Sequence, residues 1–400
     1  MRTAKTQRGF SLLELLVASA IGLVAMAAMT SLFKTGMDAT FTVAQRAETQ
    51  QNMRAAIELM TKDITLAGAG LPSGGLQLVS GGTLSNIACN QGGTCYVNGG
   101  TYPPSAAGAP NFMYPIEPGF NTGVQGGAAI VAAPGLTNSR LTTVYCDYNF
   151  PMSNFGFTSN FPGAATVTVN AIAAPAVGLP TNIQAAGGLQ VGDVLLFVIN
   201  TPGNGKTVTG TSLVQNAAVV GEITGIAGNP APPAVTAGAV VAFAPGDALN
   251  FNQNGGGQTN NMASVAAAAN APGAQMSVCR LEVVTYFLQV PPAGGGLVQT
   301  PRLMRQVNGL NAVPVADNII NLQFTYDVIN SATGTVNSNQ QDPIGAALSP
   351  ALIQKVNIVI MGQSLTTKGN KAQSMYLATA VSTRDMSFCN SYSSNTTQCQ

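Results

Sequence analysis

The stretch GFSLLELLVASAIGLVAMAAMTSLF, residues 9–33, decides the fold. From Phe10 onward it contains one charged side chain, Glu14. An α-helix rises ~1.5 Å per residue, so a helix of this length can cross the ~30 Å hydrocarbon core of a bilayer. Basic residues dominate the short segment before it, and such residues stay on the cytoplasmic side. The chain after Phe33 is therefore expected to lie outside the cytoplasm.

Three kinds of export segment compete for this stretch. A cleaved secretory signal peptide fits the basic start and the A-x-A-like site Ala25-Met26-Ala27, but the apolar run is longer than such regions usually are. An uncleaved signal anchor explains the length. It does not explain Glu14, because a carboxylate in lipid is costly without a partner. The third kind is a prepilin signal.

The segment Gly9-Phe10-Ser11-Leu12-Leu13-Glu14 resembles the class III signal of type IV prepilins and type II secretion pseudopilins. The resemblance implies that a prepilin peptidase cleaves between Gly9 and Phe10 and that Phe10 becomes N-methylated. It also implies that Glu14 serves peptidase recognition and filament assembly.

The chemistry of the processed terminus agrees with this resemblance. After cleavage, Phe10 would carry a cationic amine in an apolar environment, and a buried charge needs a counter-charge. Glu14 of one subunit could supply it to a neighbour and so set the stagger between helices. Alternatively, Glu14 caps the helix start, where an anion favours the positive end of the dipole. The two roles are compatible.

Helical character is expected to continue past the membrane. Residues 34–67 lack proline, and Met53, Ile57, Met60 and Ile64 form an apolar stripe at helical spacing. A Gly- and Pro-containing segment at 68–72 then ends the helix. The predicted organisation is a leader at 1–9, a membrane or filament-core helix at 10–33, its amphipathic continuation at 34–67 and an extracellular head at 68–400. Whether the helix kinks at its glycines stays open.

The head is predicted to be β-rich, which makes the fold class α+β: a pilin-like long N-terminal α-helix packed on a large antiparallel β-rich head. Val-, Ile- and Thr-rich runs bounded by Gly, Pro or Asn predict the strands. These are 141–146, 166–172, 193–199, 207–214, 218–226, 239–244, 281–290, 303–307, 319–328, 356–361 and 376–384. Long loops are expected at 71–127 and 252–275.

Three stretches of the head, at 192–198, 315–326 and 377–385, resemble conserved segments of PilW-type minor pilins. This resemblance implies a part in pilus assembly or initiation at or near the pilus tip. Implied partners are other pilins and minor pilins, the prepilin peptidase, the inner-membrane assembly platform and a large tip adhesin. The chain would be a single-pass inner-membrane protein with a periplasmic head, then part of an extracellular pilus. A J-type secretion pseudopilin and a pilus-borne adhesin module are the alternatives.

Cysteine usage predicts disulfides. An even number of cysteines behind an export segment is typical of an oxidising compartment. Six cysteines allow 15 pairings, and sequence proximity favours the first two and the last two as partners, which leaves the middle two. The predicted pairs are Cys89–Cys95, Cys389–Cys399 and Cys146–Cys279.

Charge and composition argue against several functions. With 16 Lys+Arg against 15 Asp+Glu there is no basic face for nucleic acid, and with no histidine there is no His-based catalysis, zinc or haem site. The segment GNGKT at 203–207 lacks the first Walker glycine and precedes a predicted strand, so we expect a hairpin turn. Asp327 and Asp342 are expected in solvated loops rather than at a metal site. Paired catalytic carboxylates stay open. We expect a structural protein without cofactor or metal, with a membrane-tethered enzyme as the weakest alternative.

Overall fold

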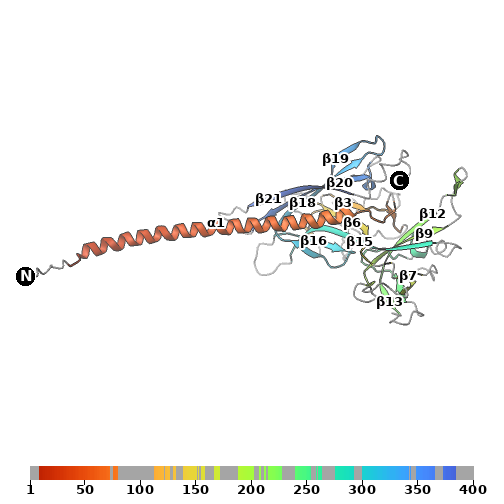
Figure 1. The fold of residues 1–400 in the computed structure, drawn as a ribbon, viewed down its shortest axis with the longest axis horizontal. Coiled ribbons are helices and arrows are strands. Elements are labelled where there is room, and N and C mark those ends of the chain that lie inside the picture. Colours follow the sequence, from red (N-terminus) through yellow and green to blue (C-terminus); the bar gives the residue numbers. More distant parts are fainter. Residues whose placement is uncertain are drawn as a thin grey trace, which may run out of the picture.

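A long helix that projects from a β-rich head makes up the computed structural model (Figure 1). The structure describes residues 9–72, 75–79, 112–120, 122–126, 129–131, 138–150, 152, 155–157, 166–171, 188–201, 207–208, 211–212, 215–227, 239–253, 258, 260–263, 275–291, 300–341, 343, 348–364 and 373–383. Within these residues the α+β class predicted from sequence is confirmed.

The helix α1 runs over Leu12–Leu66 as 55 residues without a break, so neither glycine of its first half ends it. It stops where Gly68 and Gly70 adopt positive φ, a conformation that glycine reaches at no steric cost. The departing chain then pairs with a strand of the head. Gly68 N donates to Val144 O at 2.9 Å, and Cys146 N donates to Ala69 O at 2.8 Å. These bonds tie the end of the helix to the head.

A nine-stranded sheet forms the middle of the head. Its main path runs β12-β9-β15-β16-β17, that is Gln215–Glu222, Val194–Thr201, Gln275–Val290, Arg302–Val307 and Val313–Ala316. Off this path lie β3 (Ile116–Gly119), β4 (Val124–Gly126), β5 (Ala129–Val131) and β6 (Arg140–Cys146). Leu281 of β15 pairs with both Cys146 and Val194, so β6 and β9 flank β15 on opposite edges. The 16-residue β15 thereby connects the helix side of the head with its distal side.

Two further sheets have four strands each. One has the order β19-β18-β20-β21: Val336–Gln340, Ile319–Ile329, Ile353–Gln363 and Ser374–Ser382, with the 3-10 turn η2 (Pro350–Leu352) before β20. The other has the order β13-β14-β8-β7: Gly225–Ala227, Ala239–Ala242, Thr166–Ala171 and Phe155–Phe157. Two short pairs complete the description: β1 (Leu76–Gln77) with β2 (Phe112–Met113), and β10 (Thr207–Val208) with β11 (Thr211–Ser212).

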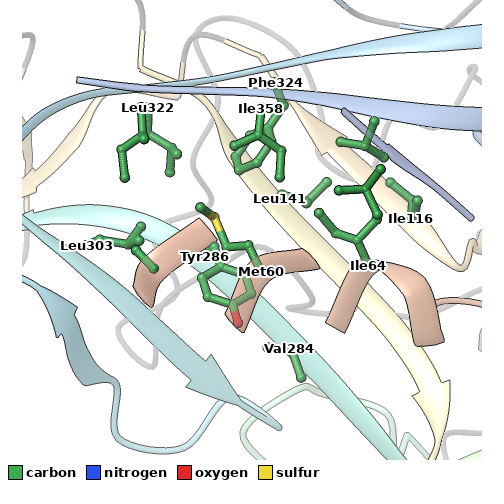
Figure 2. Packing of buried hydrophobic residues seen from close by; sticks show 14 of the residues in the cluster. Met60, Ile64, Ile116, Leu141, Val284, Tyr286, Leu303, Leu322, Phe324 and Ile358 are labelled. Atoms are coloured by element: carbon green, nitrogen blue, oxygen red, sulfur yellow. The ribbon is translucent and has the colours of Figure 1, made fainter. Parts of the chain in front are cut away.

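The second half of α1 lies between two of these sheets (Figure 2). Met60 and Ile64 of the helix meet Tyr286 of the nine-stranded sheet and Leu322 and Ile358 of the β18–β21 sheet. Every one of these side chains is fully buried. Burial of a large apolar side chain contributes ~1.5–3 kcal/mol, so this layer accounts for a large share of the stability of the helix–head unit. The amphipathic stripe predicted from sequence is therefore core packing.

Two other apolar cores lie on the distal side of β15. In one of them Phe197 packs edge-to-face on Phe243 with ring centroids 5.8 Å apart. The other gathers Leu76, Met113 and Phe251 around the far face of the central sheet. Neither core includes a residue of α1, so both belong to the head alone.

Most of the predicted strands are present, with three corrections. The predicted loop at 71–127 contains β1, β2, β3 and β4; β3 reads IEPG, and its burial against β6 overrides the poor strand propensity of proline and glycine. The predicted strand at 207–214 is the separate pair β10 and β11. The predicted strand at 218–226 is divided into β12 and β13. Strands β5, β7, β17 and β19 were not predicted, because they are short or, as in β19 (VNSNQ), polar. Most of the predicted loop at 252–275 lies outside the described residues.

Candidate assembly site on the N-terminal helix

The start of α1 is closed by a capping box. Ser11 Oγ accepts a hydrogen bond from Leu13 N at 3.3 Å, and Glu14 Oε2 accepts one from Ser11 N at 3.3 Å. Such a pair satisfies backbone donors that a helix start leaves without partners. The capping role considered for Glu14 is therefore present in the single chain. Gly9 and Phe10 precede the helix, and the Phe10 side chain is 84% exposed.

The first half of α1 is an apolar surface that the head does not cover. Among the described residues, α1 is the one helix long and apolar enough to cross a membrane by length and composition. The most apolar 18-residue window has a mean hydropathy of 2.2 and is not buried anywhere in the fold. The hydroxyls of Ser19 and Thr30 donate to helix carbonyls at 2.9 and 2.8 Å, which leaves little polarity on this surface. Only lipid or another protein can cover it.

Apolar exposure extends past the predicted membrane segment. Met37, Phe41 and Val43 remain exposed, and burial starts at Thr49 and Met53. The exposed apolar surface thus continues to the point where α1 enters the head. A bilayer core accounts for the first ~20 residues, so these three side chains are available to a neighbouring protein.

The entry of α1 into the head is closely packed. Arg46 Nε donates to Gln373 Oε1, and Gln50 Nε2 donates to Met375 Sδ at 3.6 Å. At Gly362 of β20 the helix comes so near that an added Cβ would lie 2.7 Å from Thr49 Cγ2. This glycine is what allows the close approach between helix and sheet.

A buried carboxylate, Asp63, joins the second half of α1 to the nine-stranded sheet. Its side chain is 2% exposed. Tyr145 and Tyr286 donate their hydroxyls to it at 3.0 and 2.5 Å, and Arg305 Nε donates at 2.8 Å. Glu282 lies at the edge of the cluster, where its Oε2 lies 3.0 Å from the Tyr145 hydroxyl, whose single proton it shares with Asp63, and 3.7 Å from Arg305 Nη2.

Electrostatics keep these donors in the right protonation state. Burial and then the charge of Asp63 raise the pKa of Tyr145 and Tyr286, so both hydroxyls stay protonated. Burial by itself would lower the pKa of Arg305, but the hydrogen bonds and charge of Asp63 raise it overall. Sequence reasoning did not identify this cluster. The available signal was a carboxylate three residues after Met60, within the apolar stripe.

The disulfide Cys146–Cys279 joins β6 to β15. In the sequence analysis, proximity along the chain paired the other four cysteines, and Cys146–Cys279 was the pair that remained. Beside it, Arg280 forms an ion pair with Asp147 and stacks over the Phe150 ring at 4.0 Å from the centroid. Cys89, Cys95, Cys389 and Cys399 lie outside the described residues.

Acidic side chains of the described head have structural partners. The expectation that Asp327 lies in a solvated loop is wrong, because Asp327 is a buried residue of β18 that pairs with Lys355 Nζ at 2.7 Å. Although burial opposes the change, this hydrogen-bonded partner lowers the pKa of Asp327. Asp342 lies outside the described residues. No group of three or more His, Cys, Asp or Glu residues suited to a metal occurs in the part of the chain that the structure describes. Residues 203–206 lie outside the described residues, and Thr207 begins β10, which pairs with β11, while the preceding β9 pairs with β12. The hairpin turn predicted at 203–207, between β9 and the strand that follows it, is therefore not confirmed.

One buried carboxylate pair exists on the distal side. Glu222 Oε2 accepts from Leu249 N at 3.1 Å, while Asp247 accepts from Phe251 N at 2.6 Å and Asn252 N at 3.1 Å. Burial raises the pKa of Glu222 to about 7, and burial also raises that of Asp247. Because backbone amides engage both groups, this pair fixes the loop after β14.

Comparison with known proteins places the N-terminus in a known class. The family model described as "Prokaryotic N-terminal methylation motif" matches residues 4–30. The match spans Gly9, Phe10 and Glu14 and continues along the exposed part of α1 to Thr30. No curated protein and no solved structure matches the chain. The motif, together with the long apolar helix and β-rich head, supports a type IV pilin-like or pseudopilin-like protein that a prepilin peptidase processes and that assembles with other pilins.

Proposed function

We propose that this chain is a PilW-type minor pilin that takes part in the assembly or initiation of a type IV pilus. One observation carries the proposal: behind a prepilin signal, the first half of α1 presents an apolar surface that no described part of the head covers. A surface of this size requires another molecule to cover it. Before assembly that molecule is the inner-membrane lipid, and after assembly it is the set of neighbouring helices in the filament core.

The proposed processing follows from the residues at the helix start. Cleavage after Gly9 gives Phe10 a free amine, which is then methylated. Nothing lies within 4 Å of a Cβ added at Gly9, so the fold itself does not require glycine there. We infer that the peptidase imposes this requirement. Glu14 uses Oε2 for the capping box of its own helix, and as a carboxylate with two oxygens it can also accept from the amine of a neighbour.

The head supports a place at or near the pilus tip. It consists of the helix-packed sheets and a distal part built on the far end of β15, so it is bulky for a subunit that repeats along a shaft. In this proposal the head lies in the periplasm before assembly and outside the cell afterwards. Its partners are other minor pilins, the assembly platform and a large tip adhesin. The role is structural rather than enzymatic.

The N-terminal motif equally favours a type II secretion pseudopilin of the J type. Both functions predict the same processing and the same use of α1. They differ in which machine contains the chain. Loss of piliation with intact secretion in a deletion strain would support the minor pilin, and the reverse phenotype would support the pseudopilin.

Mass spectrometry of the N-terminal peptide, from cells with and without the prepilin peptidase, tests the processing step. We expect an N-methylated Phe10 terminus that disappears in the peptidase deletion. A Gly9→Val variant should remain uncleaved, whereas Gly22→Ala should be processed normally. Both sites have nothing within 4 Å of an added Cβ, so a difference between the variants reports recognition by the peptidase and not a change in the fold. A terminus after Ala27, or an intact Met1 in cells that contain the peptidase, would contradict the proposal.

A further inference from the structure

The described sheets differ in how their edges are protected. Proteins normally protect edge strands from pairing with other chains, because an edge strand has unpaired backbone groups. Short length, bulges, proline and charged residues all give this protection. Strand β19 has five residues and a register shift against β18. Strand β17 has four residues, a register shift and Pro314. Strand β12 carries Glu222 and lies against β1.

Strand β21 has none of these protections. Its nine residues, SMYLATAVS, include no charge, proline or glycine. They pair with β20 without a register shift, from Ser382 opposite Lys355 to Ser374 opposite Gln363. Among the described strands, β21 pairs only with β20. It is therefore a long, regular and neutral edge.

The outward side of β21 carries small side chains and one large aromatic. Ala378 and Ala380 are exposed and leave the backbone accessible, and Tyr376 is 75% exposed. An exposed tyrosine is typical of protein interfaces, because its ring supplies contact area and its hydroxyl tolerates water. The opposite side chains, such as Leu377, pack into the main core and hold the strand in place.

The position of β21 indicates which molecule lies beside it. The strand starts where α1 enters the head, next to the contacts of Arg46 with Gln373 and of Gln50 with Met375. In Figure 1 it lies along α1 on the side of the head nearest the exposed helix. The exposed Met37, Phe41 and Val43 precede this entry point along α1. A subunit packed against this part of α1 would bring its own head to this edge.

We propose that the free edge of β21 binds an extended, uncharged strand from the head of the neighbouring pilin-type subunit. The row of backbone groups selects a strand, as in other cases of strand addition, and the absence of charge favours a neutral one. Tyr376 packs against a side chain of that strand. This inference rests on the proposed function, because the filament supplies the neighbour.

Photo-crosslinking in the full-length chain, expressed in its own cells, tests the edge. A photoreactive amino acid replaces Ala378 in one strain and Ser338 of β19, an exposed edge position, in the control strain. We expect an adduct from position 378 that maps by mass spectrometry to a strand of a pilin-type head, either another copy of this chain or a different pilin. The Ser338 position should give none. An adduct within the same chain, an adduct with a protein that is not a pilin, or no adduct would overturn the proposal.

Charge on the edge gives a second measurement. In this experiment the photoreactive amino acid replaces Tyr376. The double substitution Ala378→Lys with Ala380→Lys on β21 should abolish its adduct, and the matched double substitution Val336→Lys with Ser338→Lys on β19 should retain it. Methylation of Phe10 is measured in the same strains. If Phe10 is methylated normally and the adduct persists in the strain with the β21 lysines, the strand-addition proposal alone is contradicted. If the methylated Phe10 terminus is absent, the proposed function is contradicted.

Discussion

The two halves of α1 are built from similar apolar residues and behave as different surfaces. From Leu12 to Val43 the large apolar side chains are exposed, while Met53, Met60 and Ile64 are completely buried between two sheets. Their apolar residues do not separate the halves, since methionine, alanine and leucine occur in both, although charged residues are concentrated after Phe33. The difference lies in what covers them: the chain's own head covers the second half and must leave the first half to other molecules.

Each half also contains one acidic residue in an apolar setting, and these residues have different partners. Asp63 receives hydrogen bonds from two tyrosines and an arginine of the head. Glu14 receives one from the start of its own helix. A buried charge is tolerated when it is paired, so Asp63 belongs to the folded subunit. By the same reasoning, Glu14 in lipid or in a filament core needs a partner from outside the chain.

The largest effect is expected at Asp63. Replacement by alanine removes the nearest counter-charge of the half-buried Arg305 and the acceptor of the Tyr286 hydroxyl, while Glu282 remains near Arg305 and Tyr145. Loss of one partner of a buried pair costs about 3–5 kcal/mol in the free energy of unfolding. Denaturant unfolding of the detergent-solubilised full chain measures it. Glu58→Ala, at an exposed position on the same half of α1, is the control and should change stability by less than ~0.5 kcal/mol. Equal effects of the two variants would contradict the assigned anchor role.

A matched pair of methionines tests the comparison directly. Met60 is 0% exposed and Met29 is 71% exposed on the same helix. Met60→Ala should cost about 2–5 kcal/mol in the free energy of unfolding, because it removes buried surface and leaves a cavity. Met29→Ala should leave the unfolding of the head unchanged in the same detergent. If Met29→Ala destabilises the head as much as Met60→Ala, the first half of α1 is not independent of the head.

Sequence reasoning located the helix to within two residues at its start and one at its end, because Gly9 to Glu14 and the glycines at 68 and 70 are local signals. The stripe of Met53, Met60 and Ile64 was likewise readable from helical spacing. Strands with continuous β-branched runs were found for the same reason. The residues of the capping box were available too, since Ser11 and Glu14 stand three apart.

The parts of the fold and of the site that could not be predicted from sequence depend on contacts between residues far apart in the chain. Tyr145, Tyr286 and Arg305 meet Asp63 across 82, 223 and 242 residues, and no local pattern connects them. Strand β3 has poor propensity and exists because β6 pairs with it. The free edge of β21 became visible only once the strand order was known, since an edge strand and a central strand can have the same sequence pattern.

A smaller effect is expected where the helix touches β20. In Gly362→Ala the new Cβ would lie 2.7 Å from Thr49 Cγ2, so the helix or the sheet must shift. Overpacking of this kind costs about 1–3 kcal/mol. Gly225→Ala in β13 is the control, since its added Cβ meets only Ala242 Cβ at an ordinary 3.7 Å. Thermal unfolding of both variants measures the difference, and an unchanged Gly362→Ala would show that the helix does not pack as closely as its geometry indicates.

The last prediction concerns pH and the side chain of Glu117, which is buried in β3 behind the helix-facing layer. For each pH unit, its effect on the free energy of unfolding is small. Burial raises its pKa to about 8, with the hydrogen bond from Tyr114 N opposing the shift. A carboxyl whose pKa is higher in the folded state than in the unfolded state favours folding while it is protonated. Its contribution is complete below the ordinary value near 4.5 and is lost as the pH rises through about 8. The free energy of unfolding should therefore decline across this window, by at most ~1.4 kcal/mol per pH unit.

Glu117→Gln isolates this titration from all others in the chain. The amide retains a carbonyl oxygen that can accept from Tyr114 N, but it carries no ionisable proton. The variant should match the original protein near pH 4.5 and exceed it in stability at pH 8 and above. Glu58→Gln, at an exposed site on α1, should give a pH profile parallel to the original. Parallel profiles for Glu117→Gln as well would mean that Glu117 ionises in the folded head without cost, and that the layer behind the helix is more polar than its burial indicates.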